Sequence, residues 1–398
     1  MKRPVVAVAL ALCLSAFVAP AEGQWDSSSV EAVAPGVIHR RVVVNSGPWR
    51  LNVLEVSLHQ KGISIREVKG NDVFAGLEKT SSMEQRYHGP GKAVAAVNAD
   101  FFNVKTGESE SNVVINGAIV KGLTPSASPR DGWKKLRTQF GMDESNHPYI
   151  DRFGLTARLI QGGRSMKLDG INSRPRQLDA LVLYTSTAGD STPRDTTRMS
   201  SAYLPLRFVS RSQNETTFRI AGSVYEGSRG SLAAGGALTA EGTMCDSLTR
   251  IARRGGTIRI RTGFLPGRER LRAIVGGGPR IIQNGRSVAE FGYFIEGTGA
   301  KFGTVRHPRT AVGFSKDSST LYLVTVDGRR ESDSGMSLME LADAMLKLGV
   351  YEAMNLDGGG STTMVIGDQV VNHPSDKEGE RPVGNALLVV VGDSTSHR

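Results

Sequence analysis

We predict an α+β fold built on a mixed, mostly antiparallel sheet core with few helices and long loops. Short apolar runs separated by turn residues recur along the chain, as is typical of strands, whereas a 3.6-residue period clearly marks only one long helix. The chain also has 47 glycines among its 398 residues. That glycine content suits a turn-rich, mostly β architecture better than a helical one.

The N-terminal residues predict a secretory signal peptide. Lys2 and Arg3 precede an apolar run over residues 5–18, and small residues suited to cleavage follow at 19–21. The apolar run is too short to span a membrane stably. We therefore expect residues 1–21 to be removed and the mature protein to be exported, to the periplasm or the extracellular space, without a stable membrane anchor. A retained anchor is the alternative.

The mature chain divides, by prediction, into a β-rich lead segment over residues 22–90 and a main domain over residues 91–393. Residues 25–40 are expected to be a short lead. Apolar and polar residues then alternate over Trp49–Leu58 and Gly62–Val68. This alternation predicts two half-buried strands around the turn between them.

One helix of the main domain has clear boundary signals. Ser337 and Glu340 have the spacing of a capping box, an apolar stripe follows, and Gly349 suits the left-handed position after a helix. With strands expected at 321–326 and 350–356, this helix predicts a crossover between neighbouring strands.

The rest of the main domain is expected to consist of strands and loops. Residues 128–263 are irregular in pattern and belong either to the same domain or to an inserted subdomain. Further elements are predicted as a short helix at Thr80–Tyr87 and buried strands at Ala93–Val97, Ala273–Val275, Ala311–Phe314 and Ala386–Val391.

Charge and cysteine content narrow the function classes. Loss of the signal peptide leaves Cys245 as the only cysteine, which excludes an intrachain disulfide and suggests a buried structural thiol. The net charge of +10 favours anionic partners such as phosphate-bearing glycans, although a solvated basic face is the alternative. No nucleic-acid-binding signature occurs, so we expect no nucleic acid partner.

The run Asn355-Leu-Asp-Gly-Gly-Gly-Ser-Thr-Thr363 is the most informative stretch. Consecutive glycines allow unusual backbone angles or a close approach to another group, and their N–H groups can form an anion-binding nest. A P-loop is excluded, because no helix and no Gly-Lys-Ser/Thr ending follow. The alternatives are an ordinary hairpin turn and a phosphate or sugar site.

Several carboxylates are candidates for catalysis. Asp100 follows a buried strand, where burial raises the pKa of a carboxyl group and makes it useful as an acid or base. An Asx turn made by Asn98 or Asp100 is the alternative. If Asp327, Glu340 and Asp357 converge, the site holds the paired carboxylates that cleave glycosidic bonds. Asp327 can also mark a turn, and Glu340 can be only the capping-box partner.

Other polar residues suggest anion binding. Arg309 offers a planar fork that grips two phosphate oxygens, with a surface salt bridge as the alternative. His307 precedes a proline, so it either shapes the loop or transfers protons. Ser361 lacks the Gly-x-Ser-x-Gly context of a serine nucleophile. The second glycine bend at Gly277 and the strand-end residue Asn385 have ordinary turn and capping alternatives.

Seven motifs carry a resemblance to a known family. They are Val97-Asn-Ala-Asp-Phe-Phe102, Gly276-Gly-Gly-Pro-Arg-Ile-Ile282, His307-Pro-Arg-Thr-Ala-Val-Gly313, Leu321-Tyr-Leu-Val-Thr-Val-Asp-Gly-Arg329, Gly335-Met-Ser-Leu-Met-Glu-Leu341, Asn355 to Ser361, and Arg381-Pro-Val-Gly-Asn-Ala386. In this order they resemble the phosphodiester glycosidase family, which includes the lysosomal mannose-6-phosphate uncovering enzyme. The resemblance implies hydrolysis of a sugar-1-phosphodiester at its glycosidic bond.

The resemblance and the local patterns together define the candidate site. The candidate catalytic residues are Asp100, Asp357, Asp327 and Glu340. The candidate substrate-binding residues are Asn98, Arg309, Thr310, Arg329, Asn355, Gly358, Gly359, Gly360, Ser361, Thr362, Gly277 and Asn385.

We therefore expect an exported hydrolase that acts on a sugar-1-phosphodiester in a glycan or envelope polymer. An ordinary glycosidase without a phosphate requirement and a non-catalytic cell-wall glycan-binding protein are the alternatives. No cofactor is expected to be required. Zinc is disfavoured because the seven histidines are dispersed. Calcium held by clustered Asp side chains and carbonyls stays open.

Overall fold

The computed structural model describes residues 25–125, 136–173, 179–193, 201–212, 214–227, 229–267 and 271–392. The predicted signal peptide lies outside these ranges. None of the helices within them has the length and apolar character needed to span a bilayer.

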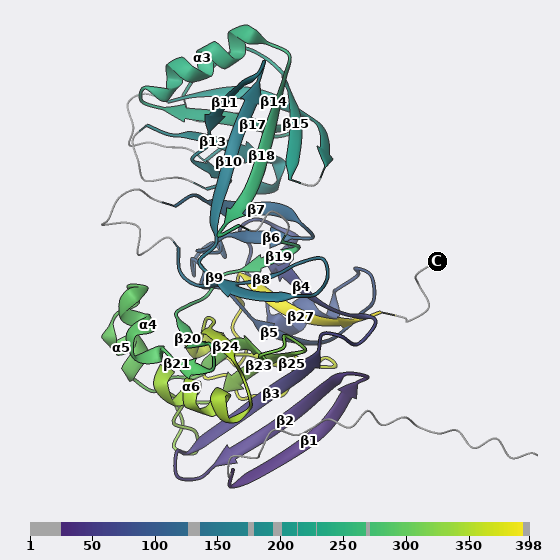
Figure 1. Cartoon of the computed structure of the whole chain (residues 1–398), viewed down its shortest axis with the longest axis vertical. Helices are drawn as coiled ribbons and strands as arrows, with labels where there is room; N and C mark the ends of the chain where they lie inside the picture. The colour runs from purple at the N-terminus through teal and green to yellow at the C-terminus, as the bar shows by residue number, and fades with distance from the viewer. Residues whose placement is uncertain are drawn as a thin grey trace, which may run out of the picture.

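An antiparallel sheet of eight strands, counted over the described residues, lies at one end of the molecule (Figure 1). Its strands, in spatial order, are β1 (Ser27–Ala34), β2 (Val37–Val44), β3 (Trp49–Ser57), β23 (Thr320–Val326), β22 (Arg309–Phe314), β24 (Glu352–Asn355), β20 (Arg280–Gln283) and β21 (Arg286–Ser287). Strand β3 pairs along its length with β23, so residues from both ends of the chain share this sheet. The expected short lead over residues 25–40 contains β1 and the start of β2.

The predicted crossover between neighbouring strands is wrong in one respect. Helix α6 (Leu338–Lys347) does connect β23 to β24. However, β22 lies between these two strands and pairs antiparallel with both of them. The helix therefore crosses over one intervening strand.

A second antiparallel sheet packs against the first. Its strands, in spatial order, are β26 (Gln369–Val370), β25 (Met364–Ile366), β5 (Lys92–Asn98), β27 (Asn385–Val391) and β4 (Ile63–Lys69). The two strands expected around the turn near residue 60 exist, but β3 and β4 belong to different sheets. Strand β4 pairs with β27 instead, from Ile63 opposite Val391 to Lys69 opposite Asn385.

Apolar side chains of these two sheets form a common core. Leu54 and Leu323 of the first sheet and Val97 and Leu387 of the second are fully buried in it. The packing brings the ends of β5, β22 and β24 close together, because they lie on facing sheets.

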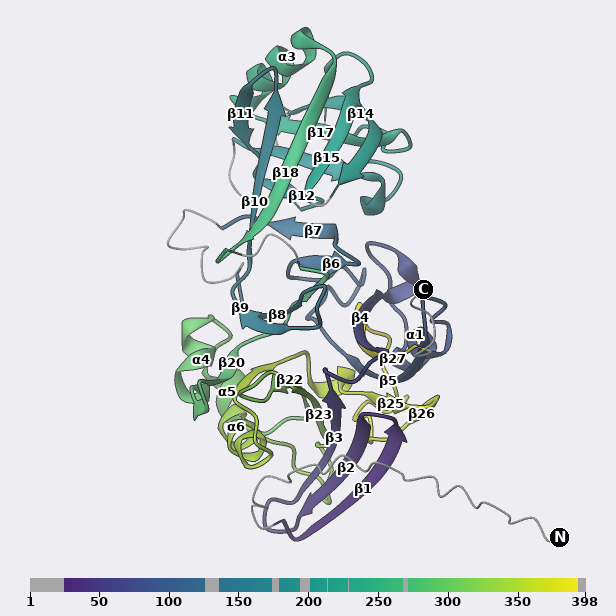
Figure 2. The same ribbon diagram turned by 45° about the vertical axis from the view of Figure 1, so that its right-hand side comes forward.

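The third sheet is mixed and extends away from the other two (Figures 1 and 2). Its strands, in sequence order, are β6 (Val113–Ile115), β7 (Ala118–Leu123), β8 (Gln139–Met142), β9 (Pro148–Asp151), β10 (Gly154–Gln161), β11 (Arg164–Lys167), β12 (Gly170–Ile171), β13 (Leu181–Thr185), β14 (Ser201–Ser212), β15 (Glu215–Ile220), β16 (Tyr225–Glu226), β17 (Gly235–Glu241), β18 (Thr257–Leu265) and β19 (Ala273–Val275). The pairing of β12 with β13 is parallel, and this pair makes the sheet mixed.

Strands β10 to β18 and helix α3 (Met244–Arg254) enclose a hydrophobic core of their own. Leu155, Leu204, Phe218 and Leu248 are fully buried there. This separate core favours the inserted-subdomain interpretation of residues 128–263. Cys245 lies on α3 and is half-buried, with its Sγ 3.6 Å from the carbonyl oxygen of Ala240.

The remaining helices of the described residues are short. They are α1 (Thr80–Gln85), α4 (Ala289–Ile295) and α5 (Ala300–Thr304), with 3-10 turns η1 (Gly70–Asp72), η2 (Ser186–Ala188) and η3 (Gly359–Ser361). The predicted capping box of α6 is confirmed, since Ser337 Oγ accepts from Glu340 N and Glu340 Oε2 accepts from Ser337 N. Gly349 has φ +87°, the predicted left-handed conformation. The predicted fold class, a mixed and mostly antiparallel α+β fold, is confirmed.

Candidate active site at the glycine bends

The glycine run connects the first two sheets. Strand β24 ends at Asn355 in the eight-stranded sheet, and β25 begins at Met364 in the five-stranded sheet. The interpretation of this run as a hairpin turn is therefore wrong. Gly359–Ser361 form a single 3-10 turn, and Gly359 has φ +63°. Only a residue tolerant of left-handed backbone fits at position 359 without strain.

Asn98, at the end of β5, ties the motifs together. Its Nδ2 donates to the carbonyl oxygen of Asp357 at 2.7 Å. Its Oδ1 accepts from Thr310 Oγ1 at 2.7 Å and from Thr363 N at 3.0 Å. Asn98 and Thr310 are fully buried, and their polar groups hold the loop in place. This geometry gives both residues a role in positioning the loop.

Asp100 is a buried carboxyl group beside the glycine bends. Its Oδ2 accepts from Ser111 N at 3.1 Å and its Oδ1 from Ser111 Oγ at 3.2 Å. Burial raises the pKa of Asp100 to about 7, against the opposing effect of the Ser111 amide. A Cβ on Gly276 would lie 2.1 Å from Asp100 Oδ1, so a glycine is required there for Asp100 to pack. The predicted rise in pKa by desolvation matches this environment.

Asp357 lies next to Asp100 in space. Its backbone N–H donates to the carbonyl oxygen of Ala99 at 2.8 Å, so the two acidic residues meet at one strand end. Asp357 Oδ1 accepts from Gly358 N at 2.9 Å. The residue is half-buried, so it is more open than Asp100.

Burial raises the pKa of Asp357 to about 6. The Ser361 hydroxyl, the Gly358 amide and the charge of Arg381 act in the opposite direction. Ser361 Oγ makes no hydrogen bond of ordinary length within the described part of the chain, so its effect is that of a nearby dipole. Asp357 is thus a carboxyl group that titrates near neutral pH in a partly open position.

The second glycine bend packs against the first, as expected from the resemblance. Asn355 Nδ2 donates to the carbonyl oxygen of Gly278 at 3.0 Å, and Gly278 N donates to that of Asn355 at 2.7 Å. A Cβ on Gly277 would lie 2.6 Å from the Asn355 carbonyl oxygen. Asn355 and Gly277 therefore hold two loops together, which is a structural role.

The backbone amides of the glycine run form only a small part of the expected anion nest. Gly358 N donates to Asp357 Oδ1, and Gly359 N donates to the carbonyl oxygen of Pro308 at 2.9 Å. Ser361 N and Thr362 N close the 3-10 turn through carbonyl oxygens of the run itself. These four amides are occupied by the protein, so side chains must supply most of any anion recognition.

The expectation that Arg309 clamps a phosphate is not supported by its position. Its Nε donates to the carbonyl oxygen of Met336 at 2.9 Å, and its Nη2 donates to those of Phe302 and Val305 at 2.7 and 3.0 Å. The side chain is 1% exposed. Arg309 therefore fixes loops, and this buried bonding replaces the salt bridge considered from the sequence.

Two other arginines flank the glycine bend. A Cβ on Gly359 would lie 3.0 Å from Arg329 Nη2, and one on Gly360 would lie 2.2 Å from Arg381 Nη2. Arg329 is exposed, and among the described residues its Nη1 makes only a long contact of 3.4 Å with Ser375 Oγ. Arg381 forms a two-bond ion pair with Asp376 at 2.7 and 3.0 Å. Arg329, a predicted substrate-binding residue, is thus the more available cation.

Asp327 is connected to the end of the glycine run near Thr362. Its Oδ1 accepts from His373 N at 2.8 Å and from Asn372 Nδ2 at 3.2 Å. Burial raises the pKa of Asp327, against the opposing hydrogen bonds from His373. Asn372 Nδ2 also donates to the carbonyl oxygen of Thr362 at 3.1 Å, so Asp327 supports the run through Asn372.

Glu340 is engaged away from the two central carboxyl groups. It is the capping-box partner of Ser337, and Arg306 donates to both of its carboxylate oxygens, with Nε 3.0 Å from each. Burial tends to raise the pKa of Glu340, but the Arg306 hydrogen bonds lower it overall. The convergence of Glu340 with Asp327 and Asp357 in one catalytic group is therefore not supported.

Several hydroxyl groups at the bend have no partner within the described residues. Ser361 Oγ, Thr362 Oγ1 and Thr363 Oγ1 are all buried and unpaired there. Unpaired buried polar atoms are uncommon in folded proteins and mark places where a ligand or water completes the bonding. Ser361 and Thr362 were predicted to bind substrate, and their geometry is compatible with that role.

Asn385 connects Asp100 to Glu67, a buried polar residue that was not selected from the sequence. Its Oδ1 accepts from Asp100 N at 2.9 Å, and its Nδ2 donates to Glu67 Oε1 at 2.7 Å. Lys69 lies nearby and donates to Ser109 Oγ at 2.9 Å.

Alternation along β4 could have indicated that Glu67 and Lys69 point inward. Arg381 could have been selected because it stands in a quoted motif.

Within the described ranges, no group of three or more His, Cys, Asp or Glu side chains is placed to hold a metal ion.

The comparisons with known proteins define the class. The family model for phosphodiester glycosidase matches residues 214–390, a stretch that contains six of the seven quoted motifs. The chain is 43% identical over 76 residues to N-acetylglucosamine-1-phosphodiester alpha-N-acetylglucosaminidase of Bos taurus, which is 19% of this chain and 14% of that protein. It is 41% identical over 80 residues to the Homo sapiens protein of the same name, which is 20% of this chain and 15% of that protein.

A bacterial relative matches as well. The SPbeta prophage-derived uncharacterized protein YomE of Bacillus subtilis (strain 168) is 37% identical over 89 residues, which is 22% of this chain and 14% of that protein. The matches thus span only a small part of each curated relative. Residues 214–390 of this chain are thus similar to the phosphodiester glycosidase family.

Solved structures share the fold. A hypothetical protein from Synechocystis aligns with a TM-score of 0.72 at 20% identity, over 92% of this chain and 64% of that one. A putative exported protein from Burkholderia pseudomallei aligns with a TM-score of 0.65 at 23% identity, over 86% of this chain and 74% of that one. At these identities, the likeness establishes the architecture alone.

Proposed function

We propose that this protein is exported and hydrolyses the glycosidic bond of a sugar-1-phosphodiester in a glycan or envelope polymer. The match of residues 214–390 to the phosphodiester glycosidase family model supports this reaction class. The curated mammalian relatives are named for it, as N-acetylglucosamine-1-phosphodiester alpha-N-acetylglucosaminidases.

The observation that carries the proposal is the position of Asp357. It is a half-buried carboxyl group with a pKa of about 6, held by backbone hydrogen bonds at the glycine bend. The guanidinium groups of Arg329 and Arg381 lie over the adjacent glycines. A carboxylate beside cations suits a substrate in which a sugar carbon is joined to an anionic phosphate.

In the proposed reaction, water adds to the anomeric carbon and the bond from that carbon to the phosphate oxygen breaks. The oxygen leaves with the bonding electrons as part of a phosphate monoester. This leaving group needs little protonation, so the main tasks are to hold the phosphate and to activate water or attack the sugar. We assign the first task to Arg329 with Arg381, and the second to Asp357.

Asp100 has a supporting role in this scheme. It is 1% exposed, and both of its oxygens accept hydrogen bonds from Ser111. With a pKa of about 7 it retains a proton in a large fraction of molecules at neutral pH. Its role is to hold the strand end, since Asp100 N also donates to Asn385 Oδ1 and the neighbouring Ala99 carbonyl accepts from Asp357 N.

The proposal is tested by turnover of a panel of sugar-1-phosphodiesters, with the products identified by phosphorus NMR. We expect at least one member to release a phosphate monoester and a free sugar. Turnover of neutral aryl glycosides at equal efficiency would indicate an ordinary glycosidase. Binding of the phosphodiesters without turnover would indicate a glycan-binding protein.

A further inference from the structure

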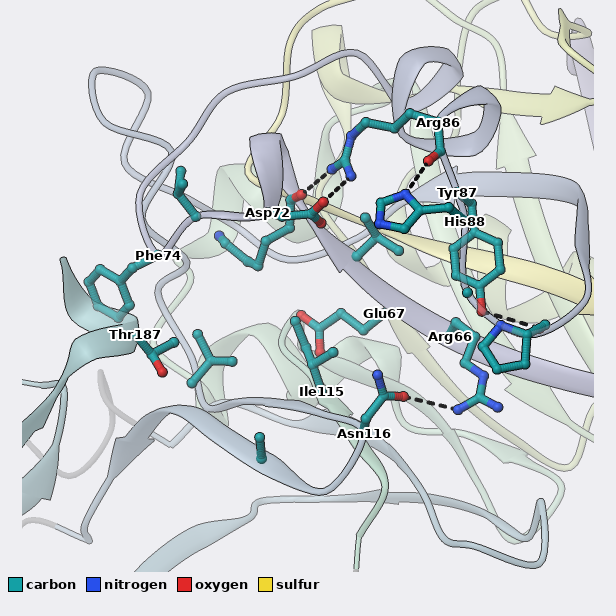
Figure 3. A pocket seen from close by; sticks show the side chains of 17 residues that line it. Arg66, Glu67, Asp72, Phe74, Arg86, Tyr87, His88, Ile115, Asn116 and Thr187 are labelled. Atoms are coloured by element: carbon teal, nitrogen blue, oxygen red, sulfur yellow. Dashed lines mark hydrogen bonds and ion pairs between the residues drawn. The ribbon is translucent and has the colours of Figure 1, made fainter. Parts of the chain in front are cut away.

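A cavity of about 380 Å³ opens beside β4 (Figure 3). Its walls come from β4, the loop after η1, the segment after α1, the β6–β7 hairpin and η2, and none of its lining residues belongs to the two glycine bends. The volume falls in the range of roughly 300–1,000 Å³ that is usual for small-molecule sites. The position and size indicate a second site, separate from the candidate active site.

Glu67 is the residue that most strongly suggests a ligand. It lines the cavity and is 3% exposed. Its Oε1 accepts from Asn385 Nδ2 at 2.7 Å, while Oε2 has no partner within the described residues. In Figure 3 its carboxyl group faces the middle of the cavity. An unsatisfied buried polar atom costs about 1–3 kcal/mol, which a hydrogen-bonding ligand can offset.

Charged side chains around the cavity already have partners, including Arg66, whose Nη1 donates to Asn116 Oδ1 at 3.0 Å. Arg86 forms an ion pair with Asp72 at the cavity wall (Figure 3). Lys69 donates to the carbonyl oxygen of Gly107 at 3.0 Å and to Ser109 Oγ at 2.9 Å. Burial raises the pKa of Glu67 well above its usual range, which disfavours the charged form of this carboxyl group. These features favour a neutral ligand over an ion.

The other lining groups suit a polyhydroxylated molecule. Tyr87, His88, Asn116 and Thr187 bring a phenol, an imidazole, an amide and a hydroxyl to the walls. Phe74 and the ring of Tyr87 add apolar surface on opposite sides of the cavity (Figure 3). Hydroxyl-binding groups combined with aromatic faces match the polar edge and the C–H face of a sugar ring.

We propose that this cavity binds one neutral saccharide unit, with Glu67 and Asn116 as hydrogen-bonding groups and Phe74 and Tyr87 as apolar walls. The site goes beyond the proposed hydrolysis and does not depend on it. Asn385 connects it physically to the candidate active site, since its side chain bonds both Glu67 Oε1 and Asp100 N. A glycan substrate would thereby bind at two places. A sugar in the cavity would also contact Glu67, which is hydrogen-bonded through Asn385 to Asp100.

Saturation-transfer NMR with free glucose and N-acetylglucosamine as probes tests the proposal on the full chain without turnover. The blocking variant is Val73→Trp, because Val73 lines the cavity and is 48% exposed, so added bulk reaches the cavity without entering the core. The matched control is Val30→Trp on β1, where Val30 is 55% exposed on an edge strand that contributes no residue to the cavity. Asn116→Asp, which keeps a side chain suited to φ +49°, is a second test variant.

We expect saturable binding of at least one sugar, weakened tenfold or more by Val73→Trp and unchanged by Val30→Trp. Asn116→Asp should alter the affinity while the protein stays folded. Absence of binding by both sugars would overturn the proposal. So would binding that survives Val73→Trp and disappears in Asp357→Asn, because it would belong to the active site. Binding of inorganic phosphate that Val73→Trp abolishes would identify an anion site instead.

Discussion

Asp357 and Asp100 show how neighbouring carboxyl groups acquire different properties. Both have a raised pKa because of burial, to about 6 and about 7. Asp357 is half-buried and bonded to Gly358 N, whereas Asp100 is closed off by Ser111 and Gly276. The more accessible and more acidic of the two is the better candidate for contact with substrate.

Replacing Asp357 by Asn should therefore remove most of the activity. The amide keeps the size and can still accept from Gly358 N, but it can neither ionise nor take up a proton. We expect a loss of about 10²–10⁴-fold in kcat on a sugar-1-phosphodiester. Asp343→Asn, at an exposed position of α6, is the control and should leave kcat unchanged. Near-normal turnover by Asp357→Asn would exclude Asp357 from the chemistry.

Arg329 should distinguish anionic from neutral substrates. Its guanidinium lies over Gly359 and, within the part of the chain that the structure describes, has one long side-chain hydrogen bond, to Ser375. Loss of a charge-assisted hydrogen bond costs about 1.5–3 kcal/mol, so Arg329→Gln should lower kcat/KM on a phosphodiester by roughly tenfold to a hundredfold. Activity on a neutral aryl glycoside should change much less.

The adjacent Arg330 provides the control for this variant, because it is also exposed and lies one residue further along the chain. Arg330→Gln should leave both activities unchanged. Equal losses on the two substrates in Arg329→Gln would show that Arg329 supports the loop rather than the phosphate.

At the scale of elements, each of the two glycine bends connects strands that belong to different sheets. The run from Asn355 to Thr363 passes from the first sheet to the second, and the Gly276–Gly278 bend packs against its start. The backbone of Gly276 lies close to the Asp100 side chain, and the backbone of Gly360 lies close to the Arg381 side chain. Glycine is needed at these positions because no side chain would fit.

Gly360→Ala tests this requirement. The new Cβ would lie 2.2 Å from both Arg381 Nη2 and Asp376 Oδ1, so the ion pair must move. We expect both the melting temperature and kcat/KM to fall. Gly222→Ala is the control, because its nearest contacts at 3.6 Å are ordinary and it lies in the third-sheet region. An unchanged ion pair and unchanged kinetics in Gly360→Ala would show that the bend tolerates side chains.

Local elements were predictable where a signal is contained in a short stretch. Ser337, Glu340 and Gly349 determine helix α6 through neighbouring residues alone, and all three have the predicted roles. The partner of β4 was not predictable, because strand alternation identifies a strand but not its neighbour. Pairing with β27 depends on residues more than 300 positions away.

At the scale of the whole molecule, the sequence indicated which residues meet at the candidate site. It did not indicate the hydrogen-bond partners of each residue. The motifs at Asn98, Thr310, Asp357 and Asn385 do meet. The role of Arg309 depends on the carbonyl groups of α5 and of Met336, and the role of Asn372 on distant Asp327. Such contacts arise only from tertiary packing, so no local pattern reveals them.

The buried acids should also make stability depend on pH. Unfolded Asp and Glu ionise near their usual pKa values of about 4, whereas folded Asp100 keeps its proton up to about pH 7 and Asp357 up to about pH 6. The folded state therefore binds more protons between about pH 4 and 7, and its stability falls as pH rises through this range. Other groups add their own terms, so the contribution of Asp100 is isolated by comparison with a variant.

Urea unfolding at several pH values measures this effect. The difference in unfolding free energy between wild type and Asp100→Asn should shift in favour of the variant as pH rises from 4.5 to 7.5. Asp343→Asn should show no such shift. A difference that stays constant across this range would mean that Asp100 ionises normally in the folded protein.

The central claim is that the bond between the anomeric carbon and the phosphate oxygen is the one that breaks. Hydrolysis of a sugar-1-phosphodiester in ¹⁸O-labelled water tests it directly, with the label located by mass spectrometry of the sugar and by the isotope shift in phosphorus NMR. Glycosidic cleavage predicts ¹⁸O at the anomeric hydroxyl of the sugar and none in the phosphate monoester. Incorporation of ¹⁸O into the phosphate would contradict the account, because water would then have attacked phosphorus.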